Sequence, residues 1–125
     1  MALNYPLTMN RNDWKKTIDD LLVNGRCGDE INIERRDSFL VYQKTPQNHV
    51  EIVRQIIKNG YYLYYVTGSL GNDLIMTGRY FISKSKYAAK RSYETLYGWK
   101  SSRVRLVTDM NEINSVLSDK NKMPL

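Results

Sequence analysis

Basic and aromatic side chains gather in one stretch of the chain, between Arg79 and Arg105. This stretch holds eight Lys and Arg residues against one acid, Glu94, which gives it a net charge of +7. The whole chain carries +6, so the remaining residues sum to −1. The basic residues alternate with aromatic ones, namely Tyr80, Phe81, Tyr87, Tyr93, Tyr97 and Trp99. The excess positive charge therefore belongs to this stretch alone.

This combination of residue types suits nucleic acid. Lys and Arg gain free energy beside phosphates because condensed counterions are released, and aromatic faces stack on unpaired bases. The residues expected to make contact are Lys84, Lys86, Tyr87, Lys90, Arg91, Lys100, Arg103 and Arg105. A plain solvated surface and a binding site for an acidic protein partner are the competing interpretations.

The expected elements divide these residues into two groups. On a helix over 84–97, Tyr87 and Arg91 fall on the side away from the apolar stripe. On the strand that follows, Arg103 and Arg105 share one face because side chains alternate. Both arginines would join the basic helix if that face of the sheet is open.

Three short sequences resemble known motifs but lack an essential part. Residues 68–71, Gly-Ser-Leu-Gly, have no Gly-Lys-Ser/Thr and lie between two strands, so they predict a hairpin turn rather than a phosphate-binding loop. Residues 83–86, Ser-Lys-Ser-Lys, suggest an activated hydroxyl, but helix capping explains them more simply. Four carboxylates that could hold magnesium are better explained as a salt-bridged outer surface: Asp29, Glu30, Glu34 and Asp37.

Neither His49 nor Cys27 has the neighbours that catalysis needs. His49 is expected on the inner edge of a helix, where a histidine packs and hydrogen-bonds. Cys27 follows Arg26 in a polar loop, but no second Cys exists in the chain. We therefore predict no catalytic residue, no metal site and no cofactor. A histidine-free nuclease built from Tyr, Lys and Arg stays open, because such sites have no fixed spacing.

Length and composition predict one domain. A chain of 125 residues with 42% hydrophobic residues can fill one core over 1–125, with 1–10 and 119–125 as flexible ends. One Cys and one His exclude a disulfide framework within the chain and metal sites built on several such ligands. No apolar run is long enough to cross a membrane, so we expect a cytoplasmic protein. Abundant Asn, Lys and Tyr suggest an AT-rich genome, such as that of a phage or mobile element.

Periodicity and turn residues predict elements in the order αββαββαβα. A helix at 46–58 is predicted most strongly, with Thr45 as its N-cap, Pro46 in its first turn and Asn59-Gly60 at its end. The fold class is then α+β, a single two-layer domain with a mostly antiparallel sheet of about five strands and three to four helices. The other helices are expected at 13–24, 84–97 and 109–117. Asn12 is the expected N-cap of the first, and the second is expected to begin after Ser83, to turn Ala89, Tyr93 and Leu96 inward and to end at Gly98. The strands are expected at 30–35, 39–43, 61–67, 74–82 and 102–107, with the first two and the next two forming hairpins.

An internal αββ repeat is a further possibility. At a shift of 35 residues, Ile18 aligns with Val53, and the helix ends Asn24-Gly25 and Asn59-Gly60 coincide. Chance similarity between two helix–hairpin units is the competing explanation.

Three functions compete. The leading one is a small, basic, non-enzymatic nucleic-acid-binding protein, DNA or RNA, with a regulatory or accessory role. The alternative is a protein-binding inhibitor or anti-defence factor, of anti-restriction or anti-CRISPR type, that blocks a host nucleic-acid enzyme through the same surface. A small nuclease is the third. Composition does not separate the first two, because Tyr and Arg are also favoured at protein interfaces.

Overall fold

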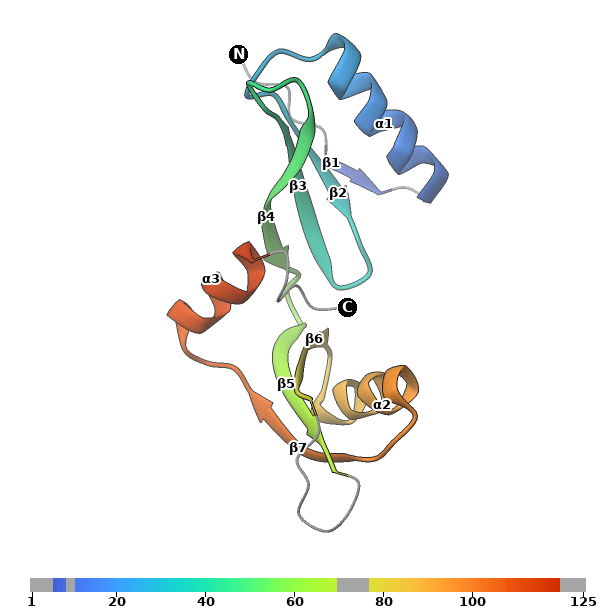
Figure 1. Cartoon of the computed structure of the whole chain (residues 1–125), viewed down its shortest axis with the longest axis vertical. Coiled ribbons are helices and arrows are strands. Elements are labelled where there is room, and N and C mark those ends of the chain that lie inside the picture. Colours follow the sequence, from blue (N-terminus) through green and yellow to red (C-terminus); the bar gives the residue numbers. More distant parts are fainter. Residues whose placement is uncertain (1–5, 9–10, 70–76, 120–125) are drawn as a thin grey trace. The chain divides into compact units, whose positions relative to one another are not determined.

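The computed structural model describes residues 6–8, 11–69 and 77–119 (Figure 1). Helices and strands together confirm the α+β class, although the order differs from the predicted one. The elements are β1 (Pro6–Thr8), α1 (Arg11–Asn24), β2 (Glu30–Glu34), β3 (Ser38–Lys44), β4 (Val50–Ile57), β5 (Tyr62–Gly68), β6 (Arg79–Ser83), α2 (Lys86–Tyr97), β7 (Ser101–Leu106) and α3 (Met110–Ser118).

Two sheets replace the single five-stranded sheet that the sequence predicted. They belong to two compact units, Met1–Ile56 and Ile57–Leu125, which we describe separately. That the whole chain folds as one domain stays a prediction. Part of the N-terminal end expected to be flexible forms β1, whereas residues 1–5 and 120–125 lie outside the described residues.

The first unit is a four-stranded sheet in the order β1-β2-β3-β4, with α1 packed against it. β1 runs parallel to β2, and β2 runs antiparallel to β3, which confirms the predicted hairpin. Ile31 and Ile33 alternate with half-buried residues along β2, so both face α1 and pack with Leu21. This alternation is what a sheet with one covered face requires.

Lys44 holds the end of α1. Its ammonium donates to the carbonyls of Leu22, at 2.5 Å, and Gly25, at 2.8 Å. A cation at this end stabilises a helix because the last carbonyls lack partners within the helix. At the other end Asn12, the predicted N-cap, lies within the helix, which begins one residue earlier at Arg11.

The predicted helix at 46–58 is wrong, because the segment forms a turn and the strand β4. Asn48 donates its N–H to the Thr45 carbonyl, Thr45 donates to the His49 carbonyl, and Asn48 has a φ of 60°. This is a hairpin loop in which Pro46 takes the second position of the turn and Asn the left-handed one. β4 is rich in Val and Ile, which favour strands, and the same residues happened to recur at helical spacing.

The predicted internal αββ repeat is also wrong, because it requires a helix at 46–58. Ile18 lies in α1 and Val53 in β4, so the two aligned segments adopt different structures.

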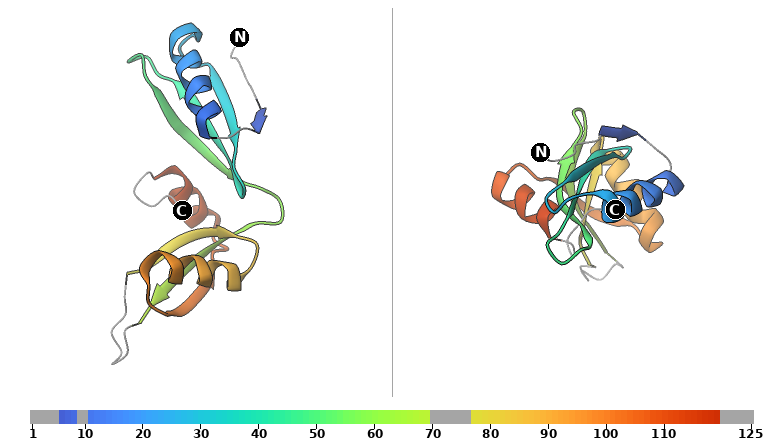
Figure 2. Two further views of the ribbon diagram at one scale, coloured as in Figure 1. Left: turned by 90° about the vertical axis from the view of Figure 1, so that its right-hand side faces the viewer. Right: turned by 90° about the horizontal axis from the view of Figure 1, so that it is seen from above.

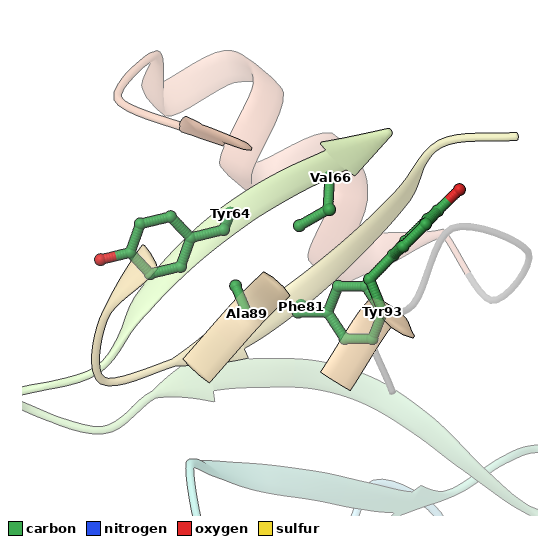
Figure 3. Packing of buried hydrophobic residues seen from close by; sticks show 5 residues of the cluster. All are labelled: Tyr64, Val66, Phe81, Ala89 and Tyr93. Carbon is green, nitrogen blue, oxygen red and sulfur yellow. The ribbon is translucent and has the colours of Figure 1, made fainter. Parts of the chain in front are cut away.

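The second unit is a three-stranded antiparallel sheet, β6-β5-β7, with a helix on each face. On one face α2 packs Ala89 and Tyr93 against Tyr64, Val66 and Phe81 (Figure 3). This two-sided covering corrects the predicted two-layer arrangement for this unit. The opposite face carries α3 (Figure 2). Its contact with the sheet is a cluster of Leu63, Ile82, Val107 and Val116, with Ile57, Ile113 and Leu117 packed around it.

The ends of α2 show how its sequence sets its position. Ser85 rather than the predicted Ser83 is the N-cap, and its hydroxyl accepts from the Ala88 N–H at 3.1 Å. Gly98 ends the helix as predicted, in a left-handed conformation that favours glycine. Leu96 was expected in the core but is 46% exposed.

A buried hydroxyl ties α2 to its surroundings. Tyr93 is fully buried, and its hydroxyl donates to the Thr77 carbonyl at 2.7 Å and accepts from the Trp99 indole N–H at 2.9 Å. Gly68 makes room for this contact, because a Cβ at Gly68 would lie 2.6 Å from the Tyr93 hydroxyl. The strand prediction at 74–82 is correct for 79–82, whereas residues 70–76 lie outside the described part.

Asn48→Val should lower the free energy of unfolding by about 1–3 kcal/mol, because a β-branched residue resists the left-handed conformation. Asn48→Gly should be neutral within about 0.5 kcal/mol. Urea denaturation measures both. Equal stability of the two variants would contradict the hairpin, since the first turn of a helix tolerates valine.

Tyr93→Phe should lower the free energy of unfolding by about 1–3 kcal/mol, because it leaves a buried indole N–H and a carbonyl unsatisfied. Tyr62→Phe is the matched control on β5, since Tyr62 is 51% exposed. Equal stability of the Tyr93 variant and the control would show that the buried hydroxyl contributes nothing.

Candidate functional site

The basic residues of α2 form one exposed surface. Lys86 and Lys90 are neighbours one turn apart, as are Tyr87 and Arg91, so the four side chains make two adjacent rows. All four are exposed, and Tyr87 is 67% exposed. We call these four residues the α2 surface. Lys84 precedes it and Lys100 follows it, and both are exposed as well.

No ion pair neutralises this surface within the part of the chain that the structure describes. Arg91 instead stacks over the Tyr87 ring, with its guanidinium carbon 5.8 Å from the ring centre. Lys84 lies over Tyr61 in the same way, at 5.4 Å. Such cation–π contacts orient a side chain but leave its charge uncompensated.

Glu94, the one acid of the basic stretch, has a structural role. Its carboxylate accepts from the Ser101 N–H at 2.9 Å and from the Ser101 hydroxyl at 3.0 Å, which joins α2 to β7. These two bonds lower the Glu94 pKa, and the nearby charges of Lys90 and Lys100 lower it further. Glu94 is thus an ionised carboxylate near Lys90 and Lys100, and it offsets part of their charge, although within the described part of the chain it forms no ion pair with either.

Arg103 and Arg105 do not join this surface. In the pairing of β5 with β7, Arg105 lies opposite Tyr65, and its guanidinium carbon is 5.4 Å from that ring. Tyr65 packs with the α3 cluster, so both arginines belong to the face of the sheet away from α2. The predicted set of binding residues is therefore divided between two faces.

Arg105 is engaged in an ion pair. It binds the Glu112 carboxylate through both guanidinium nitrogens, at 2.9 and 2.8 Å, and the Tyr80 hydroxyl donates to the same carboxylate at 2.8 Å. These bonds lower the Glu112 pKa from 4.5 to about 2. Burial and the bond to this carboxylate raise the pKa of Tyr80. The cluster connects α3 to the sheet, and the Glu112 carboxylate compensates the charge of Arg105.

An open groove is lined by α2 and β6, and it shares Arg91 with the α2 surface. It has a volume of about 440 Å³. Sequence reasoning missed it, because Leu96 was assigned to the core. The stripe actually buried follows Ala89 and Tyr93 at a spacing of four, which leaves Leu96 to one side. The lining residues are Phe81 of β6 and Arg91, Ser92, Thr95 and Leu96 of α2.

The residues tested for catalysis belong to the first unit. His49 is not on a helix but beside the β3–β4 turn, half exposed, with Glu51 at 2.7 Å. Cys27 is exposed in the loop after α1. Glu30 accepts from Arg54 at 2.9 Å, in agreement with a salt-bridged surface, whereas Asp29 is buried and accepts from the Arg26 N–H at 2.8 Å.

Among the described residues no group of three or more His, Cys, Asp or Glu is placed to hold a metal ion. None of the described helices has the length and apolar character needed to cross a membrane. No family model, no curated protein and no solved structure matches this chain.

Glu112→Gln should lower the free energy of unfolding at pH 7 by about 1 kcal/mol, a small value because Arg105 is 54% exposed. A depressed carboxyl pKa stabilises the fold above pH 4.5, and this contribution is lost as pH falls toward 2. The difference between wild type and variant should therefore shrink across that range in urea titrations. A constant difference would contradict the ion pair.

Proposed function

We propose that this protein is a non-enzymatic nucleic-acid-binding protein that contacts phosphates through the α2 surface, together with Lys84 and Lys100. Its role is regulatory or accessory, and its source is a phage or mobile element. The proposal rests on one observation. Exposed cations gather on one helix and its ends, and in the described residues no carboxylate forms an ion pair with them.

Charge pairing elsewhere supports the assignment. Arg105 and Arg54 each bind a carboxylate, so these arginines are already partnered. The cations of the α2 surface are exposed instead, and they would release counterions from a phosphate backbone. We therefore assign phosphate contact to the helix and its ends, and we leave Arg103 and Arg105 out of the principal site.

A protein target is the second candidate. Tyr87 and Arg91 are residue types that dominate interface energies, and Leu96, which lines the groove with Arg91, adds exposed apolar area. An inhibitor that blocks a host nucleic-acid enzyme would use this surface against an acidic patch or a nucleic-acid channel. This candidate predicts no affinity for nucleic acid itself.

The salt dependence of binding tests the proposal. Each phosphate contact should contribute roughly −0.7 to −0.9 to the slope of log affinity against log salt, so three to five contacts predict a slope of about −2 to −4.5. The double variant Lys90→Ala/Arg91→Ala should weaken binding to all sequences and flatten the slope by up to about two units. Fluorescence anisotropy with labelled oligonucleotides measures both quantities.

Lys15→Ala/Lys16→Ala is the matched control. It removes the same charge from exposed positions of α1 and should leave the slope close to the wild-type value. Absence of binding at low salt would overturn the proposal and favour the protein target. If the two double variants changed the affinity and the slope equally, binding would depend on net charge alone, and the assignment of phosphate contact to the α2 surface would be wrong.

A further inference from the structure

The groove beside α2 has an apolar floor, one apolar wall and polar residues around them. Phe81 is 2% exposed and closes the floor, while the half-exposed Leu96 forms an apolar wall. A volume of about 440 Å³ falls within the range of small-ligand pockets, about 300–1,000 Å³. A flat ring could therefore lie against Phe81 and Leu96.

Hydrogen-bonding groups flank the apolar part. The Ser92 hydroxyl donates to the Ala88 carbonyl at 3.0 Å, so its oxygen remains able to accept a hydrogen bond. Thr95 is exposed and has no hydrogen-bond partner among the described residues. Two hydroxyls and an apolar wall match the edge and the face of a nucleobase, which carries donors and acceptors on a flat ring.

Arg91 links the groove to the α2 surface. It lines the groove, and its guanidinium also stacks over the exposed ring of Tyr87. A cation between an aromatic platform and a groove is placed to contact the phosphate that joins two nucleotides. One base would then stack on Tyr87 while its neighbour enters the groove.

We infer that the groove binds an unpaired base and that the ligand of this protein is a single strand of nucleic acid. The inference rests on the proposed function and specifies its ligand. Bases in a duplex are stacked and paired, so they cannot enter the groove or cover Tyr87. Charge complementarity selects this occupant, because Arg91 places a positive charge at the groove and is also part of the exposed basic surface of α2.

The test compares four ligands of equal phosphate number by anisotropy: single-stranded DNA, single-stranded RNA, an abasic strand and duplex DNA. Tyr87→Ala should weaken binding to single strands by about 5- to 150-fold, the usual value of one stacked base, while Tyr87→Phe stays within about twofold of wild type. Leu96→Ala should weaken single strands by about three- to tenfold. Both alanine variants should leave abasic and duplex binding within about twofold.

Thr95→Val keeps the shape of the groove and removes its hydroxyl, so it should weaken single strands without affecting the abasic strand. Val23→Ala, at a 75% exposed position of α1, is the apolar control and should change nothing. The inference would be overturned if the Tyr87 and Leu96 variants lost equal affinity for single strands and duplex, or lost none. The proposed function would still stand in that case if wild-type binding keeps its predicted salt dependence. Absence of binding to all four ligands would overturn both.

Discussion

The position of α2 depends on the hydroxyl of Tyr93. A buried hydroxyl is costly unless it is hydrogen-bonded, and this one both donates to Thr77 and accepts from Trp99. Glycine at position 68 is part of the same constraint, because any side chain there would collide with Tyr93 and Trp99. Rings packed around Tyr93 reinforce the arrangement, with Tyr97 at 4.6 Å and Trp99 at 6.4 Å between ring centres. The rotation of α2 about its axis is thereby set.

That rotation determines which side chains of α2 face solvent. With Ala89 and Tyr93 buried, both basic rows of the α2 surface point outward, and Leu96 falls beside the core rather than in it. Two carboxylates of the unit have a lowered pKa and structural roles: Glu94 connects α2 to β7, and Glu112, in the first turn of α3, binds Arg105 of β7. Among the described residues, Lys86, Lys90 and Arg91 therefore form no ion pair and are exposed to a ligand.

Sequence reasoning succeeded where several local signals agreed. α2 has an apolar stripe, a serine cap and a terminal glycine, and the prediction differed from the structure mainly in the first turn. It failed at 46–58, where Pro46 and the Asn59-Gly60 pair serve turns as readily as helix ends, and where Val and Ile recur at a spacing that fits both structures. The segment forms a strand because β4 pairs in the sheet, and the sequence of one segment does not show which strand it will pair with.

The candidate site was predicted in part for a related reason. Exposure of Lys86, Tyr87, Lys90 and Arg91 follows from helical spacing. The face on which Arg103 and Arg105 lie follows only from the register of β7 against β5, and the partner of Arg105 comes from α3. The groove depends on the contact of α2 with β6, which composition does not reveal.

The central claim is that the α2 surface and its groove bind a single strand of nucleic acid. The most direct measurement is an NMR titration of the ¹⁵N-labelled full chain with a short single-stranded oligonucleotide. The account predicts that amide shift changes concentrate on α2, from Lys86 to Leu96, and on Phe81 beside it, and that they saturate. Saturating changes centred on other elements, or no changes at low salt, would contradict it.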